Sequence, residues 1–147
     1  MINEVILLVE DNPDDEALAI RALTKNNVTY NIVVARDGVE ALNLLFGHGS
    51  NAPITPAVIL MDLKLPKLNG IETLARIRGD ERTHTLPVVM LTTSDEDADM
   101  IRSYEAGANS YVRKPIDFAE FSRVAAQLGV YWLQLNRRPR AMTPIGN

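Results

Sequence analysis

The sequence contains no cysteine, which excludes disulfide bonds and thiolate chemistry. It also contains no apolar run approaching the roughly 20 residues that a membrane-spanning helix needs. Residues 1–4 lack the basic and apolar segments of a secretory signal. A soluble cytoplasmic protein with no membrane partner is therefore expected.

Positive charge is in short supply as well. The chain has 15 Lys and Arg residues against 19 Asp and Glu residues, and the two signs are mixed along most of its length. A nucleic-acid partner would require a basic patch, so none is expected. A length of 147 residues suits one domain with a substantial core.

Short apolar runs alternate with amphipathic stretches along most of the chain. The runs that predict strands are residues 5–9, 32–35, 57–61, 87–91 and 110–112. Parallel strands that are buried on both faces have this near-continuous apolar character. Helix-start signals stand at Asn12-Pro13, Asp37-Gly38 and Asn69-Gly70. The sequence therefore predicts an α/β fold with a doubly wound, five-stranded parallel sheet.

The C-terminal stretch has a different pattern. A spacing of three or four residues predicts a narrow apolar seam on one long helix, formed by Phe118, Phe121, Ala125, Leu128, Trp132 and Leu135. Gly129 interrupts this helix and weakens it by about 1 kcal/mol relative to alanine. Either the seam packs on its own domain, or residues 131–135 leave the core and contact a partner. The basic tail beyond Asn136 is expected to be disordered.

Charged and polar residues stand at the ends of the predicted strands. Glu10 and Asp11 follow the first strand, Asp62 the third, Thr92 the fourth and Lys114 the fifth. The carboxyl ends of parallel strands lie at one edge of an open sheet, so these side chains are expected to share a pocket. Hard carboxylate oxygens with open positions suit Mg²⁺ better than zinc. An aspartate beside a metal and a lysine can act as a nucleophile toward phosphorus.

These motifs resemble the receiver domain of two-component response regulators. The resemblance covers about residues 4–128 and rests on Val9-Glu10-Asp11-Asn12, Met61-Asp62-Leu63-Lys64-Leu65-Pro66 with Asn69-Gly70, Leu91-Thr92-Thr93, and Tyr111-Val112-Arg113-Lys114-Pro115. It implies a flavodoxin-like sheet of strand order 2-1-3-4-5 with an extended C-terminal helix. The receiver domain would span residues 1–128, and a helix end with a flexible tail would span residues 129–147.

The same resemblance implies a role for each pocket residue. Asp62 would accept a phosphoryl group from a sensor histidine kinase. Asp11, Asp62 and the backbone carbonyl of Lys64 would bind Mg²⁺ directly, while Glu10 would hold it through water. Lys114 would contact the phosphoryl group, and its bond to Pro115 would be cis. The protein would be a regulator rather than an enzyme, with slow self-dephosphorylation.

Thr92 and Tyr111 match the switch residues of the family. The resemblance implies that the threonine hydroxyl turns toward the phosphoryl group and that the tyrosine follows it inward. Residues 96–106, residues 110–112 and the last helix would then present the signal. Alternatively, Tyr111 is only a half-buried strand aromatic. Lys64 and Thr93 replace the asparagine and alanine common in chemotaxis regulators, which predicts a longer phosphoryl lifetime.

A finer resemblance concerns the pathway. Asn12-Pro13-Asp14-Asp15 together with Tyr131-Trp132 resembles the stand-alone regulators of bacterial and cyanobacterial phytochrome kinases. It implies a homodimer through the last helices, with contacts from Leu128, Tyr131, Trp132 and Leu135. No effector domain follows, so the output is expected to pass through a partner, an oligomer or onward phosphotransfer. A chemotaxis-type or phosphorelay-intermediate receiver with another kinase is one alternative, and a pseudo-receiver that only binds partners is another.

Two unrelated classes fit the residues less well. A haloacid dehalogenase phosphatase needs a second aspartate two residues after its nucleophile, where this chain has Lys64. A flavin-binding protein needs a phosphate-binding loop rich in Ser, Thr and Gly after the first strand, where this chain has acids. His48 and His84 lie away from the charged strand ends and are expected to be surface or loop residues.

Overall fold

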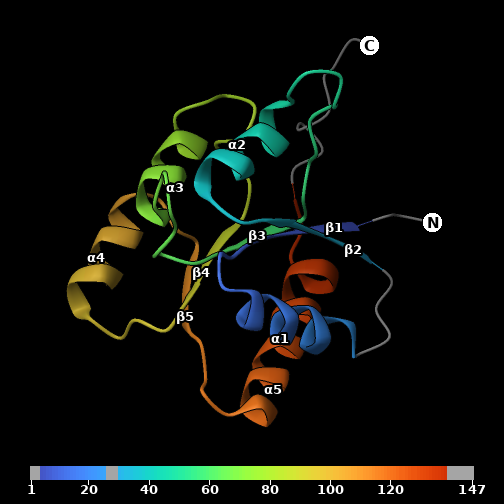
Figure 1. Ribbon diagram of the computed structural model, residues 1–147, viewed down its shortest axis with the longest axis vertical. Coiled ribbons are helices and arrows are strands. Elements are labelled where there is room, and N and C mark those ends of the chain that lie inside the picture. The colour runs from blue at the N-terminus through green and yellow to red at the C-terminus, as the bar shows by residue number, and fades with distance from the viewer. Residues whose placement is uncertain (1–3, 26–29, 139–147) are drawn as a thin grey trace.

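The computed structural model describes residues 4–25 and 30–138 of the chain. Strands and helices alternate along it, as Figure 1 shows. The elements are β1 Glu4–Val9, α1 Pro13–Thr24, β2 Tyr30–Ala35, α2 Gly38–Phe46, β3 Val58–Met61, α3 Gly70–Arg78, β4 Val88–Thr92, α4 Asp97–Glu105, β5 Ser110–Arg113, α5 Phe118–Gly129 and a π-helix, η1 Val130–Leu135. Within these described ranges, no helix has the length and apolar character needed to cross a bilayer.

The five strands form one parallel sheet of order β2-β1-β3-β4-β5. Both ends of each predicted strand lie within two residues of the ends of the observed strand. The central strands are aligned so that Val9 pairs with Met61 and Met61 pairs with Met90. The predicted doubly wound, flavodoxin-like fold and its strand order are confirmed. The carboxyl ends of β1 and β3, where the acids stand, are therefore neighbours.

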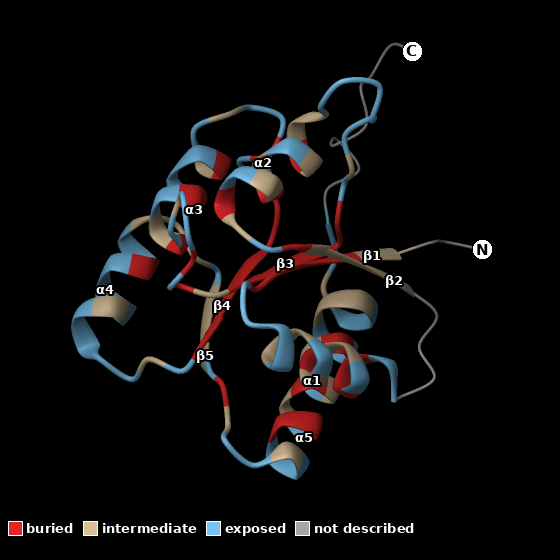
Figure 2. Ribbon diagram, viewed as in Figure 1, coloured by how far each residue is buried: buried red, intermediate tan, exposed pale blue. Residues whose placement is uncertain are grey.

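Helices cover both faces of the sheet. In Figure 1, α1 and α5 lie on one side, and α2, α3 and α4 lie on the other. Alternate side chains of β1 point to opposite faces of the sheet. Leu7 and Val9 belong to the hydrophobic cluster formed with α2 and α3, whereas Ile6 and Leu8 belong to the hydrophobic cluster formed with α1 and α5. Figure 2 shows the resulting buried layer along the strands. Burial of this apolar area on both faces is the main source of stability.

Side-chain caps begin four helices, α1, α2, α3 and α5, and the sequence predicted the first three of these caps. Asn12 Oδ1 accepts hydrogen bonds from the backbone N–H groups of Asp14 and Asp15, at 2.9 and 3.1 Å. The Asp37 carboxylate caps α2, and Asn69 forms a reciprocal capping box on α3. A capping side chain satisfies backbone donors that have no partner within the helix. The caps thus fix where each of these helices begins, close to the edge of the sheet that carries the acids.

The predicted single seam on the last helix holds as far as Trp132 and is wrong at Leu135. At Gly129, α5 ends and the chain continues as the π-helix η1, in which hydrogen bonds span five residues and each turn is wider. The wider turn changes which side chains share a face. Leu128 and Trp132 pack against the core cluster of α1 and α5. Leu135, the last predicted seam residue, is instead 63% exposed, and Tyr131, which lies outside the predicted seam, is 49% exposed.

The described chain ends close to where it begins. The Arg138 guanidinium donates hydrogen bonds to both carboxylate oxygens of Glu4, at 2.9 and 3.1 Å, and so ties the residues after η1 to the start of β1. Most of the tail predicted to be disordered, residues 139–147, lies outside the described residues.

Candidate functional site

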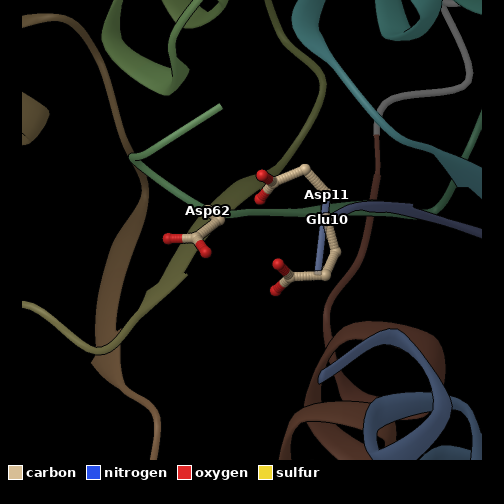
Figure 3. A group of neighbouring side chains, drawn as sticks. All are labelled: Glu10, Asp11 and Asp62. Carbon is tan, nitrogen blue, oxygen red and sulfur yellow. The ribbon is translucent and has the colours of Figure 1, made fainter. Parts of the chain in front are cut away.

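Three carboxylates meet at the carboxyl ends of β1 and β3. One oxygen from each of Glu10, Asp11 and Asp62 lies within 4.8 Å of the other two. Figure 3 shows these side chains gathered beside the strand ends. Glu10 is buried, Asp62 is half-buried and Asp11 is exposed, so the cluster opens to solvent on one side. A set of hard oxygen donors with one open side fits a divalent cation that keeps some of its water.

Lys114 lies beside these acids, directly after β5. Its side chain is 5% exposed, and its ammonium group donates hydrogen bonds to the carboxylates of Glu10, Asp15 and Asp62. The distances to Asp15 Oδ2 and Asp62 Oδ2 are both 3.2 Å. The Lys114 backbone N–H also donates to the Thr92 carbonyl at 2.6 Å, which fixes the lysine beside the end of β4.

Burial and pairing shift the pKa values of two groups in this pocket. Burial raises the pKa of Glu10, although the hydrogen bond from Lys114 and its charge act in the opposite direction. Burial alone would lower the pKa of Lys114, but the hydrogen bond to Glu10 and the charges of Asp62, Glu10 and Asp15 outweigh it, so this pKa is raised. Lys114 therefore carries a positive charge at neutral pH.

The backbone holds Asp62 in a defined orientation. Its N–H donates to the Val9 carbonyl at 3.1 Å, which ties the end of β3 to the end of β1. Its Oδ1 accepts the N–H of Leu63 at 2.7 Å, while its Oδ2 faces Lys114. The side chain is 13% exposed. One carboxylate oxygen is thus held by the chain and the other lies next to a cation.

Thr92 and Tyr111, the predicted switch pair, contact the same residue. The buried Thr92 hydroxyl accepts the N–H of Ser94 at 3.3 Å. The half-buried Tyr111 hydroxyl donates to the carbonyl of Ser94 at 2.9 Å. The Ser94 hydroxyl in turn donates to Asp99 of α4 at 2.6 Å. Ser94, which the sequence reasoning did not single out, therefore links Thr92 and Tyr111 to α4.

Other predicted residues lie at the margin of the pocket. Lys64 and Thr93 are exposed, and Lys64 borders an open groove of about 400 Å³ between the β3–α3 loop and α4. His48 and His84 are exposed residues outside the helices and strands, as expected.

The expected cis bond between Lys114 and Pro115 is wrong. Within the described residues every peptide bond is trans. The trans form is the isomer that an X–Pro bond prefers, by about 0.5–1 kcal/mol.

Comparison with known proteins identifies the family. A family model described as the response regulator receiver domain matches residues 6–126. The chain is a response regulator receiver domain. This receiver is 42% identical to the probable methanogenesis regulatory protein FilR2 of Methanothrix harundinacea, over 92% of its own length and 87% of that protein. It is 36% identical to response regulator Rcp1 of Synechocystis sp., over 94% and 95% of the two chains.

Solved structures agree with this identification. The phosphorylated cyanobacterial phytochrome response regulator RcpA superposes on the receiver with a TM-score of 0.88 and 35% identity, covering 94% of the receiver and 99% of that chain. The Mn²⁺-bound form of Rcp1 gives a TM-score of 0.84 at 35% identity, covering 92% and 99%. The receiver thus belongs to a family of regulatory proteins and is homologous to phytochrome response regulators.

Sequence reasoning missed Asp15 as a pocket residue. It stands in the first turn of α1, and it entered the sequence analysis only as part of the motif Asn12-Pro13-Asp14-Asp15. The available signal was its position in the first turn of the helix that begins four residues after the end of β1. In the structure its carboxylate reaches Lys114.

Proposed function

We propose that this receiver accepts a phosphoryl group on Asp62 from a sensor histidine kinase linked to a phytochrome of the bacterial type. The observation that carries the proposal is the position of the Lys114 ammonium, 3.2 Å from Asp62 Oδ2, in a pocket that holds two further strand-end acids. A nucleophilic carboxylate, a fixed cation and a cluster of metal-binding oxygens are the parts that phosphoryl transfer requires.

In the proposed reaction, an Asp62 oxygen attacks the phosphorus of the kinase phosphohistidine. The new P–O bond forms as the P–N bond breaks, and the imidazole keeps the electron pair. Lys114 donates a hydrogen bond to a phosphoryl oxygen and offsets the charge that gathers there. The hydrogen bond from Leu63 to Asp62 Oδ1 holds the carboxylate still while Oδ2 reacts.

The pocket suits Mg²⁺, which we propose as the cofactor. Glu10, Asp11 and Asp62 supply the hard oxygens, and the Lys64 backbone carbonyl is the fourth proposed contact. When bound, the ion neutralises charge on the phosphoryl oxygens. The description of an Rcp1 structure as its Mn²⁺-bound form supports a divalent ion in a homologue.

Signalling is proposed to begin at Thr92. Its hydroxyl would leave the Ser94 N–H for the phosphoryl group, which removes a hydrogen bond from the loop that also holds the Tyr111 hydroxyl. Since Ser94 also contacts α4, the change would reach a surface that partners can bind. The exposed Lys64 and Thr93 are proposed to slow self-dephosphorylation.

Similarity to a phytochrome response regulator favours a phytochrome kinase over the alternatives. Because a histidine kinase uses ATP, we also propose that the receiver is cytoplasmic. The net charge of −4 favours a protein partner over nucleic acid. A chemotaxis-type or phosphorelay kinase remains the second candidate. A pseudo-receiver is disfavoured, because Asp62, Lys114 and Thr92 are all in place.

Phosphotransfer profiling tests the pathway. Phytochrome-linked, chemotaxis-type and phosphorelay histidine kinases are autophosphorylated and mixed with equal amounts of the receiver. We expect the initial rate from the phytochrome-linked kinase to exceed the others by on the order of a hundredfold. Equal rates, or a faster rate from a chemotaxis-type kinase, would reassign the pathway while leaving the receiver chemistry intact.

We further propose a homodimer through the C-terminal segment, residues 129–147, as an extension of a receiver domain of residues 1–128. Among the described residues of this segment, the exposed large apolar side chains are Val130, Tyr131 and Leu135. Leu128 and Trp132 border the adjacent groove of about 500 Å³. A twofold interface needs one self-complementary patch, and a protruding apolar edge beside a groove supplies one.

Leu135→Ser tests this interface, because it removes an exposed apolar side chain without touching the core. It is expected to raise the dimer dissociation constant by about tenfold, measured by sedimentation equilibrium. Ile116→Ser is the matched control, since Ile116 is 97% exposed but lies before α5, outside the segment. If both variants sediment like the wild type, the proposed contact is wrong.

A further inference from the structure

The Lys114 ammonium has three N–H donors, and three different carboxylates are within hydrogen-bonding distance of it. Glu10 and Asp62 belong to the strand-end cluster, but the third acceptor, Asp15, comes from the first turn of α1. The Asp15 side chain is 32% exposed, compared with 3% for Glu10. The lysine is therefore shared between the phosphoacceptor and an acid from a helix.

Asp15 contacts Lys114 but is not part of the proposed metal site. The acids whose oxygens lie within 4.8 Å of one another are Glu10, Asp11 and Asp62, and Asp15 is not among them. The neighbouring Asp14 is exposed, and the ion pairs of Lys114 in the described chain do not include it. Two adjacent acids on one helical turn thus differ in burial and in contact with Lys114, because only the less exposed Asp15 reaches the lysine.

We propose that Asp15 is a fourth acid of the phosphoryl pocket and that it weakens the interaction between Lys114 and the phosphoryl group. This proposal rests on the proposed function. When Asp62 is phosphorylated, a phosphoryl oxygen takes the place of Asp62 Oδ2 as the acceptor. Asp15 keeps its own contact with the lysine. Its negative charge then offsets the positive charge that Lys114 offers and repels the phosphoryl oxygens. Asp15 acts through Lys114 and is therefore a positioning residue.

Asp15→Asn isolates this effect, because the amide oxygen still accepts a hydrogen bond from Lys114 while the charge is lost. The probe is beryllofluoride, a phosphoryl mimic, added with saturating Mg²⁺ and followed by calorimetry. We expect Asp15→Asn to bind it about five- to tenfold more tightly than the wild type. The affinity for Mg²⁺ alone, measured in the same way, should change by a smaller factor, because Asp15 lies outside the metal cluster.

Asp14→Asn is the matched control, since it removes the same charge from the same helical turn without a contact to Lys114. It should bind beryllofluoride as the wild type does, which separates the proposed role from a general effect on the start of α1. If Asp15→Asn does not fold, as judged by circular dichroism, Asp15→Ser removes the same charge and carries the same expectation.

The outcomes separate the two proposals. If the wild type binds beryllofluoride and Asp15→Asn binds it equally or more weakly, the role of Asp15 is overturned while the function stands. An equal gain in Asp15→Asn and Asp14→Asn would also overturn it, because the effect would then be one of net charge. If the wild type fails to bind the mimic with Mg²⁺ present, both proposals are contradicted.

Discussion

Replacement of Lys114 by methionine is expected to lower the free energy of unfolding by about 3 kcal/mol at pH 8 in metal-free buffer. The lysine is 5% exposed and is the cation that Glu10, Asp15 and Asp62 share. Its removal leaves Glu10 buried without a compensating charge, which costs more than a neutral replacement of the whole pair would. Urea unfolding monitored by circular dichroism measures the loss.

The loss should depend on pH in a definite direction. Burial already raises the pKa of Glu10 above 4.5, and the variant also lacks the hydrogen bond and charge that act to lower it. A group with a raised pKa in the folded state stabilises the fold below its unfolded pKa and loses that contribution as the pH rises through the folded value. The difference between Lys114→Met and wild type should therefore be small near pH 4.5 and grow toward pH 8.

Lys67→Met is the control, because Lys67 forms an ion pair with Asp37 at 3.5 Å but is 67% exposed. It should cost less than about 1 kcal/mol. Millimolar Mg²⁺ should recover part of the stability of Lys114→Met and leave the control unchanged, since the ion supplies charge to the same acids. Equal losses in the two variants, or a loss that does not vary with pH, would show that Lys114 does not compensate the buried acid.

Gly70→Ala is expected to destabilise the receiver by about 3 kcal/mol and to impair its chemistry. A Cβ at this position would lie 2.3 Å from the Asp62 carbonyl oxygen and 2.9 Å from Leu63 Cα. Both are backbone atoms, so no side-chain rotation relieves the contact. Either α3 or the end of β3 must move, and displacement of Asp62 should slow phosphorylation by acetyl phosphate by on the order of a hundredfold.

Gly129→Ala provides the opposite case. A Cβ there meets nothing within 4 Å, and the residue has helical angles, φ −61° and ψ −47°. This change should stabilise the protein by up to about 1 kcal/mol and leave phosphorylation unchanged. Thermal unfolding together with acetyl phosphate labelling compares the two variants. Normal labelling of Gly70→Ala would mean that α3 moves and that the position of Asp62 does not depend on this contact.

The strands and the acid cluster could be predicted because both depend on short apolar runs and on the residues that directly follow them. An apolar run such as residues 57–61 identifies a buried strand, and in a parallel sheet the residue after it lies at the same edge as the residues after its neighbours. That rule is sufficient to place Glu10, Asp11, Asp62 and Lys114 in one pocket from the amino-acid sequence alone.

The remaining features depend on geometry that spacing does not encode. A spacing of three or four residues assumes α-helical turns, so the π-helix at Val130–Leu135 moved Leu135 off the predicted seam. The contact between Asp15 and Lys114 depends on the orientation of α1 relative to β1. The contact of Ser94 with α4 depends on the path of the loop between β4 and α4. Arg138 meets Glu4 only because the fold brings the residues after η1 beside the start of β1.

Transfer of phosphate from an autophosphorylated, phytochrome-linked histidine kinase is the decisive test of Asp62 as the phosphoacceptor. Labelled phosphate is followed to the wild type, to Asp62→Asn and to Asp14→Asn, with Mg²⁺ present, and the labelled peptide is identified by mass spectrometry. We expect label on Asp62 in the wild type, equal label in Asp14→Asn and none in Asp62→Asn. Label that persists in Asp62→Asn, or that maps to another residue of the wild type, would contradict the assignment.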